Sequence, residues 1–238
     1  MRSKQGILYG IGVGPGDPDL ITLAAVKALA VVDTVFAPAS IKNDFSLALD
    51  IIRPHLREDV LIRRLDFPMT RDDEIRCRAR MQNAQAVLEH LNTGRSAAFI
   101  TLGDPLIYST FGHLSRDMRK CDADVDIRII PGITSYQASA ARLGRTLVEG
   151  DECLAVTTGN AEPEQLDRLL NTADAVVILK PAKRFAILRK ALRDKGLDKR
   201  ARLVERCGLS GESVYSNLDN VPEQLSYFSL LHIGRNRE

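Results

Sequence analysis

Two loops of the sequence combine glycine, proline and aspartate in a pattern that could bind a small ligand. The first is GIGVGPGDPD at residues 10–19, with four glycines around Pro15, and the second is TLGDPLIYSTF at residues 101–111. Glycine lets a ligand approach the backbone closely, and Pro105 fixes the bend after Asp104. Each loop also has a structural interpretation. The first could be a tight strand-to-helix connection, and the second a turn in which Asp104 binds its own backbone.

The first loop does not match the two common glycine motifs for nucleotide phosphates. Its glycines occupy positions 10, 12, 14 and 16, with Pro15 where the dinucleotide motif GxGxxG would end. The triplet GK[ST] of a phosphate loop is absent from the sequence. Pro15 has no backbone N–H to donate to an anion. We therefore interpret this loop as the wall of a pocket rather than as an anion-binding nest.

A third loop of the same kind is IIPGITSYQASAA at residues 129–141. Thr134 and Ser135 fall where a helix is predicted to begin, so helix capping is the structural interpretation of both residues. Ligands of open α/β sheets bind at the carboxyl ends of strands, where loops of this kind lie. Three such loops after three predicted strands favour a binding site more strongly than any one of them.

Composition and charge limit the class of protein. The 238 residues are 45% hydrophobic and 27% charged, with a net charge of +2, and this near balance argues against a nucleic-acid partner. The four cysteines form no CxxC pair and the four histidines are isolated, so we predict no metal site. No apolar run suits a membrane span or a signal peptide, and we expect a cytoplasmic protein with no membrane partner.

Predicted strands alternate with predicted helices along the whole chain. Apolar, β-prone runs end at each of the three loops, and runs with helical periodicity separate them, which predicts an α/β fold. The stretch RDMRKCDADVD at residues 116–126 is polar and interrupts this alternation. We place a domain boundary there and expect two α/β domains, residues 1–120 and 121–238.

Four segments, taken in order, resemble the tetrapyrrole methylases, the class III methyltransferases that use S-adenosylmethionine. They are GIGVGPGDPDLITLAAVKAL, LGDPLIYSTF, IIPGITSYQA and AVVILKPAKRF, and the resemblance covers nearly the whole chain. It implies two α/β domains with S-adenosylmethionine in the cleft between them, usually in a homodimer. It also implies that the N-terminal domain, with the GPG and GDP loops, is the substrate side and the C-terminal domain the cofactor side.

The resemblance further implies which residues contact the cofactor. Leu102 replaces the first glycine of the family's GGD segment. Cys207 stands where glycine or alanine is common, so we expect a backbone contact there rather than thiol chemistry. The positions carried over are Pro15, Leu102, Gly103, Asp104, Ile107, Thr134, Ser135, Leu179, Lys180, Cys207 and Ser229.

Other segments are similar to the family members that methylate carbon 20 of precorrin-2 in cobalamin synthesis. They are FPMTRD at residues 67–72, LVERCGLSGESVY and SYFSLLHI, together with YSTF after GDP. Members that methylate uroporphyrinogen III carry an acidic residue at the end of the second strand, where this chain has Ala37 and Pro38. The resemblance therefore implies precorrin-2 or cobalt-precorrin-2 as the substrate, with a slight similarity to the cobalt-dependent members.

Tetrapyrrole substrates of this kind carry many carboxylates, so we expect lysine or arginine side chains beside them. Lys42 and Arg71 are the candidates because they lie in segments that resemble the subfamily. The basic run at residues 183–202 is interpreted instead as a solvated helix face and loop. A proton must leave after methyl transfer, and the resemblance places Tyr108 and Asp104 beside the cleft, which makes them candidate catalytic residues.

Three other functions stay open at this point. An enzyme of the same fold could methylate another tetrapyrrole carbon or a diphthine precursor. The second alternative is an RNA methylase or RNA-binding protein of similar fold, although the near-neutral charge and the lack of interleaved aromatic and basic residues disfavour it. The third alternative is a regulator that binds S-adenosylmethionine without turnover.

Overall fold

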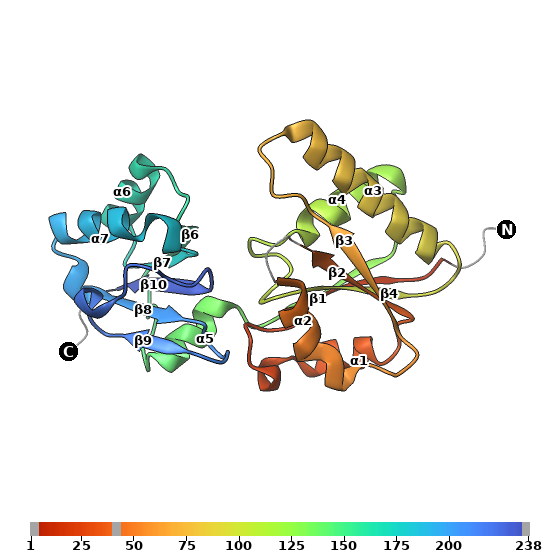
Figure 1. Ribbon diagram of the computed structural model, residues 1–238, viewed down its shortest axis with the longest axis horizontal. Helices are drawn as coiled ribbons and strands as arrows, with labels where there is room; N and C mark the ends of the chain where they lie inside the picture. The colour runs from red at the N-terminus through yellow and green to blue at the C-terminus, as the bar shows by residue number, and fades with distance from the viewer. Residues whose placement is uncertain (1–4, 40–43, 235–238) are drawn as a thin grey trace. The chain divides into compact units, whose positions relative to one another are not determined.

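The computed structural model describes residues 5–39 and 44–234, and these form two compact units (Figure 1). The first unit ends at Thr134 and the second begins at Ser135. Each unit has its own sheet and its own hydrophobic core. No helix of the described residues is both long enough and apolar enough to span a lipid bilayer.

The first unit contains a parallel sheet of five strands in the order β3-β2-β4-β1-β5. Its strands are β1 (Leu8–Gly12), β2 (Thr34–Ala39), β3 (Leu61–Asp66), β4 (Ala97–Thr101) and β5 (Ile127–Ile130). Every residue of the central strand β4 is buried, because helices cover both faces of the sheet. The α/β fold predicted from the alternation of strands and helices is confirmed.

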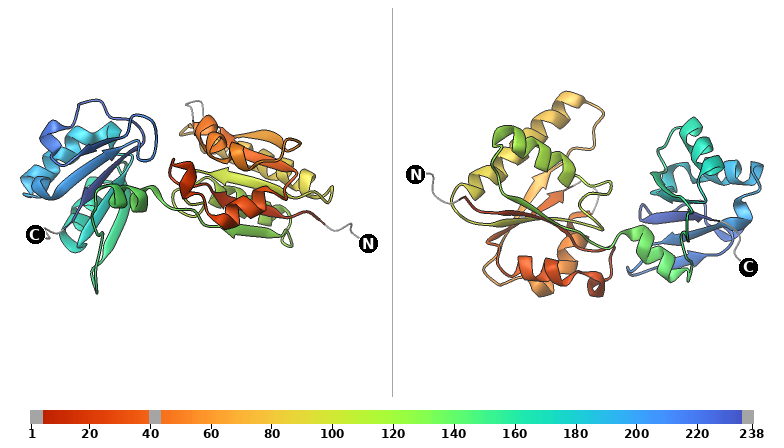
Figure 2. Two further views of the ribbon diagram at one scale, coloured as in Figure 1. Left: turned by 90° about the horizontal axis from the view of Figure 1, so that it is seen from below. Right: turned by 180° about the vertical axis from the view of Figure 1, so that it is seen from behind.

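The helices of this unit lie in two layers, one on each face of the sheet, as Figure 2 shows. One layer consists of α1 (Leu23–Leu29) and α2 (Asp44–Ile52), and the other of α3 (Asp73–Leu91) and α4 (Phe111–Cys121). Successive side chains of a strand point to opposite faces. Ala98 and Ile100 of β4 therefore pack with α1 and α2, whereas Ala97 and Phe99 pack with α3 and α4. This two-sided packing fixes the register of the strand.

The first unit extends beyond residue 120, where the domain boundary was expected. β5 pairs with β1 in the first sheet, so the first unit continues through β5 to Thr134. The polar stretch at residues 116–126 is the last part of α4 and the turn after it. Its polarity is that of the exposed face of a surface helix rather than that of a linker.

The second unit contains a mixed sheet of five strands in the order β6-β7-β10-β8-β9. β6 and β7 are parallel, and the other neighbouring pairs are antiparallel. The strands are β6 (Leu154–Thr158), β7 (Ala175–Leu179), β8 (Ala201–Glu205), β9 (Ser213–Tyr215) and β10 (Ser229–Ile233). The helices are α5 (Ser135–Arg142), α6 (Pro163–Thr172) and α7 (Phe185–Asp194).

β7 shows how helices cover both faces of the second sheet. Val176 and Ile178 pack in a core with α6 and α7, whereas Val177 and Leu179 pack with Tyr136 of α5. A strand that is buried on both faces is apolar at most positions. This is why the sequence AVVIL carries no polar residue.

A buried histidine lies in the core of the second unit. His232 on β10 is 2% exposed, and its Nε2 lies 2.7 Å from Oγ of Ser139 on α5. Its Nδ1 is buried and has no hydrogen-bond partner among the described residues. Burial, and then the positive charge of Arg145, lowers the pKa of His232 to about 4. The ring is therefore neutral in the folded protein at neutral pH.

We predict that the free energy of unfolding decreases by about 3 kcal/mol through His232 as the pH is lowered from 6.5 to about 4. In this window the unfolded chain binds a proton at this residue and the folded chain does not. The stabilisation is therefore complete above the window and is lost as the pH falls through it. Urea unfolding followed by circular dichroism at several pH values measures the change. In His232→Gln this part of the pH dependence should disappear, and an unchanged pH dependence would contradict the assignment.

Candidate functional site

The carboxyl ends of β1 and β4 form the switch point of the first sheet. β1 leads through α1 to β2 on one side, and β4 leads through α4 to β5 on the other, with the two helices on opposite faces. Ligands of open α/β sheets bind outside the carboxyl ends of neighbouring strands whose connections run to opposite faces of the sheet. The loops at this point hold Pro15 and residues 102–104, two of the segments predicted to contact the cofactor.

Backbone hydrogen bonds join these two loops directly. Gly103 N donates to Gly14 O at 2.7 Å, and Gly14 N donates to Gly103 O at 3.4 Å. Val13 N also donates to Thr101 O at 3.0 Å. Pro15, next to this bridge, is buried. The two loops therefore form a short extension of the sheet beyond the ends of its strands.

Two further glycines are required by contact between loops rather than by a ligand. A Cβ atom on Gly132 would lie 2.1 Å from Gly103 O, and one on Gly12 would lie 2.5 Å from the same oxygen. Neither distance is possible for a real side chain without a shift of the backbone. The loops after β1, β4 and β5 are thus packed backbone against backbone.

Both carboxylate oxygens of Asp104 accept backbone hydrogen bonds. Oδ1 accepts from Leu106 N at 2.8 Å within the same loop, and Oδ2 accepts from Gly132 N at 3.1 Å in the loop after β5. The first contact is the turn that was the structural interpretation of Asp104. The second connects two loops, so this carboxylate helps to hold the strand ends together. Its role as a proton acceptor stays a prediction, and the two bonds favour the structural interpretation.

The loop after β4 exposes three consecutive apolar or aromatic side chains. Leu106 is 61% exposed, Ile107 41% and Tyr108 54%. The turn that presents them is closed by Ser109, whose Oγ donates to Oγ1 of Thr101 at 3.1 Å. Exposed apolar side chains beside a rigid loop are suited to contact a ligand.

Non-glycine residues with a positive φ occur at three places in the described chain, and each lies in or beside a predicted site segment. They are Tyr108 (+49°), Lys180 (+55°) and Arg206 (+51°). The left-handed conformation costs such residues about 1 to 2 kcal/mol. Strained residues concentrate at functional sites, where the surrounding structure holds them. The strain therefore marks these segments of each unit as candidates for a functional role.

In the second unit, four residues that the resemblance assigns to the cofactor lie close together, where β7 and β8 end and β10 begins. Leu179 ends β7, Ser229 begins β10, and Lys180 N donates to Ser229 O at 3.0 Å. Cys207 follows β8, and the amide of Arg206 donates to the carbonyl just before Ser229 at 2.7 Å. The side chains of Leu179, Cys207 and Ser229 are buried. The backbone contact of Cys207 with the cofactor stays a prediction.

Two residues near these strand ends were not predicted from the sequence to belong to the site. The ring of Tyr227 lies 5.0 Å from Nζ of Lys180, in a cation–π contact. Gly159 N donates to Leu179 O at 2.7 Å, and a Cβ on Gly159 would lie 2.7 Å from Lys180 O. Gly159 directly follows the β-prone run LAVTT of β6, and a glycine at the end of such a run was an available signal. Tyr227 depends on a contact between distant segments, which no local pattern shows.

The other predicted residues are Thr134, Ser135, Arg71 and Lys42. Thr134 is buried directly before α5, and Ser135 is the first residue of that helix. Arg71 is exposed in the loop before α3. Lys42 lies outside the described residues.

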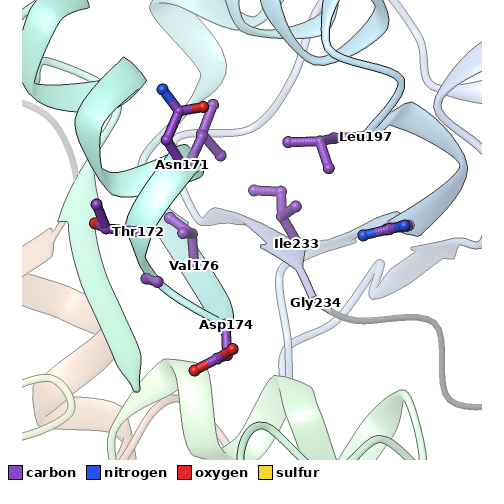
Figure 3. A pocket seen from close by; sticks show the side chains of 10 residues that line it. Asn171, Thr172, Asp174, Val176, Leu197, Ile233 and Gly234 are labelled. Atoms are coloured by element: carbon purple, nitrogen blue, oxygen red, sulfur yellow. The ribbon is translucent and has the colours of Figure 1, made fainter. Parts of the chain in front are cut away.

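A cavity of about 200 Å³ lies near the opposite ends of these strands in the second unit (Figure 3). It is lined by Asp174 and Val176, near the start of β7, and by Ile233 and Gly234, at the end of β10. Leu179 lies at the other end of β7, so this cavity is not the predicted cofactor site. In residues 5–39 and 44–234, no group of three or more His, Cys, Asp or Glu side chains could hold a metal ion.

Comparison with known proteins gives the same family along most of the chain. Residues 7–222 match the family model described as Tetrapyrrole (Corrin/Porphyrin) Methylases. A cobalt-precorrin-2 C(20)-methyltransferase from Salmonella typhimurium is 33% identical over 98% of this chain and 98% of that protein. A precorrin-2 C(20)-methyltransferase from Sinorhizobium is 31% identical over 95% of this chain and 94% of that protein. A solved cobalt precorrin-4 methyltransferase, 20% identical, has a TM-score of 0.72, with 95% of this chain and 94% of that chain covered, and shows the fold.

We predict that Gly132→Ala lowers the free energy of unfolding by about 2 kcal/mol or more, because its methyl group would collide with the backbone of Gly103. Urea unfolding at neutral pH measures the loss. Gly112→Ala is the matched control, since a Cβ on Gly112 in α4 would meet nothing within 4 Å. It should stabilise the protein by about 0.5 to 1 kcal/mol, as alanine does in a helix. Equal stabilities of the two variants would contradict the packing of the loops.

Proposed function

Because the chain belongs to the family of tetrapyrrole (corrin/porphyrin) methylases, we propose that it transfers the methyl group of S-adenosylmethionine to carbon 20 of precorrin-2, in its cobalt form, during cobalamin biosynthesis. The chain is thus an S-adenosylmethionine-dependent C-methyltransferase. The observation that carries the choice of substrate is the identity of 33% along almost the full length of a relative named for this reaction. Methylation of diphthine or RNA, or of another tetrapyrrole carbon, is not favoured.

The residues assigned to the cofactor fit a cationic sulfonium ligand. The loop segments of the first unit, residues 10–19 and 101–111, contain no lysine or arginine. They offer backbone groups, the buried Pro15 and the exposed side chain of Ile107. Walls of this kind do not repel a positive charge, whereas a cationic side chain would. In the second unit, Lys180 is the one cation among the assigned positions, and its Nζ lies over the ring of Tyr227.

Positioning is the main contribution expected from these residues. When bound, S-adenosylmethionine supplies an electrophilic methyl group. The reacting carbon must lie in line with this group, and correct alignment of two reactants can provide about 7 to 11 kcal/mol of the barrier in favourable cases. The bonds between Gly14 and Gly103, and from Gly132 to Asp104, hold the loops for that purpose.

Loss of a proton completes the reaction, and we assign its transfer to Tyr108, whose phenol oxygen accepts the proton as its hydroxyl group passes its own proton to water. The side chain is 54% exposed next to the switch point, and its backbone is held at a φ of +49°. Asp104 is the second candidate, but both of its oxygens already accept backbone hydrogen bonds. We therefore assign Asp104 to the geometry of the loops and Tyr108 to the proton.

The proposed reaction can be tested directly by identifying its product. Anaerobic incubation of the protein with S-adenosylmethionine and cobalt-precorrin-2 should add one methyl group, located at carbon 20 and detected by product mass and by labelling with a ¹³C-methyl donor. Metal-free precorrin-2 is the parallel substrate, and we expect it to react more slowly. A product methylated at another carbon, or no product from either substrate with the cofactor bound, would contradict the proposal.

The role of Tyr108 can be tested by removing its hydroxyl group. Tyr108→Phe should lower kcat by about 100-fold or more, the usual contribution of a general acid or base, because the phenol oxygen is lost. The Kd for S-adenosylmethionine should not change. Asp104→Asn should act mainly on the stability of the fold. Unchanged turnover in Tyr108→Phe would exclude an acid–base role for this residue.

The homodimer implied by the resemblance and the cytoplasmic location expected from the absence of an apolar run suited to a membrane span in the sequence stay predictions. Size-exclusion chromatography with light scattering measures the first, and cell fractionation measures the second.

A further inference from the structure

Two arginines from different helices converge on one histidine of the first unit. Nη1 of Arg80 on α3 lies 3.3 Å from Nδ1 of His113 on α4. Nη2 of Arg116, one turn further along α4, lies 3.0 Å from the same nitrogen. A guanidinium can only donate hydrogen bonds, so Nδ1 is the acceptor of both and the ring proton lies on Nε2. His113 is exposed, and none of the described residues is a partner of Nε2.

The ring of His113 is neutral at neutral pH. Its pKa is lowered from 6.5 first by desolvation and then by the positive charges of Arg80 and Arg116, against a smaller opposing effect of Asp117. A neutral ring can separate the two guanidiniums while its Nε2–H stays available as a donor.

Acidic side chains balance this cluster only in part. Asp117 is buried, and its oxygens lie 3.5 Å from Nε of Arg80 and 2.8 Å from Nζ of Lys120. One carboxylate therefore serves two cations. Arg116 makes no ion pair with any of the residues that the structure describes. An excess of positive charge is left, with guanidinium N–H groups that no acid occupies.

The cluster lies beside two loops that carry predicted site residues. His113 is in the first turn of α4, directly after the loop that contains Tyr108. On α3, one turn before Arg80, Arg76 donates from Nη1 to Thr70 O at 3.3 Å, in the loop that also contains Arg71. The two helices pack side by side on one face of the sheet (Figure 1). The basic cluster is therefore adjacent to the carboxyl ends of β3 and β4.

We propose that the guanidinium groups of Arg80 and Arg116, held next to each other by Nδ1 of His113, form a binding site for a peripheral carboxylate of the tetrapyrrole substrate. This inference rests on the proposed function, which provides a substrate with many carboxylates. Guanidinium groups bind carboxylates through paired, charge-assisted hydrogen bonds. A bound carboxylate also relieves the repulsion between two like charges that lie against one nitrogen.

The test measures binding and turnover separately in the full chain. Arg116→Gln should raise both the Kd and the KM for cobalt-precorrin-2 about tenfold, because charge-assisted hydrogen bonds are lost. The kcat and the Kd for S-adenosylmethionine should stay unchanged. Arg119→Gln is the matched control, since it removes the same charge from an exposed position of the same helix. It should change the Kd less than about twofold.

A second pair of variants separates anion binding from a structural role. His113→Glu places a carboxylate between the two arginines, so the fold should be kept while the Kd for cobalt-precorrin-2 rises by about tenfold or more. His113→Gln keeps an acceptor and a donor and should bind the substrate nearly as the parent does. A purely structural cluster predicts parent-like binding for His113→Glu, because the new ion pairs would stabilise it. Urea unfolding of each variant confirms that the fold is intact.

The outcomes distinguish this inference from the proposed reaction. Equal Kd values for Arg116→Gln and Arg119→Gln, or parent-like binding by His113→Glu, would overturn the carboxylate site. If Arg116→Gln raises the Kd and Arg119→Gln does not, but the parent forms no methylated product, the carboxylate site stands and the proposed reaction fails. If the parent does not bind the substrate, both fail.

Discussion

The candidate site of the first unit depends on backbone contacts between the loops that follow β1, β4 and β5. Gly14 and Gly103 exchange two hydrogen bonds, and the carboxylate of Asp104 accepts a third from the amide of Gly132. The loops approach so closely that a Cβ atom cannot be accommodated at Gly12. Because each loop is held by the other two, a displacement of one must displace its neighbours. The strained backbone of Tyr108 persists only in such a frame.

The second unit reaches a similar result through strand direction. β10 is antiparallel to β7 and β8, so its first residue lies beside the last residues of those two strands. The amide of Lys180 therefore donates to Ser229 O, and the amide of Arg206 donates to Phe228 O, directly before Ser229. In the first unit, all strands are parallel and the loops themselves must be bonded together. In the second, pairing between strands already brings the segments into contact.

The sequence predicts the architecture well where the physical signal is local. Strands buried on both faces are mostly apolar, as in AVVIL, and site segments follow such strands directly. The sequence predicts poorly what depends on distant residues. The bond from Gly132 to Asp104 spans 28 positions, and the contact of Arg80 with His113 spans 33. Neither pair shares a helix or a strand, so no periodicity relates them. Similarly, the polar end of α4 resembles a linker until the pairing of β5 with β1 is known.

The distribution of charge in the first unit suits two ligands of opposite sign. A sulfonium cofactor is a cation, and its binding is opposed by any nearby lysine or arginine. A tetrapyrrole with many carboxylates needs those same residues. The segments at residues 10–19, 101–111 and 129–135 contain no basic side chain, whereas α3 and α4 present Arg80, Arg116 and Lys120. One sheet can support both surfaces because the loops lie at the ends of its strands, whereas the two helices lie on one of its faces. A set of hydrogen-bonded loops without lysine or arginine, next to a basic cluster on two helices, is therefore an arrangement that suits the proposed reaction.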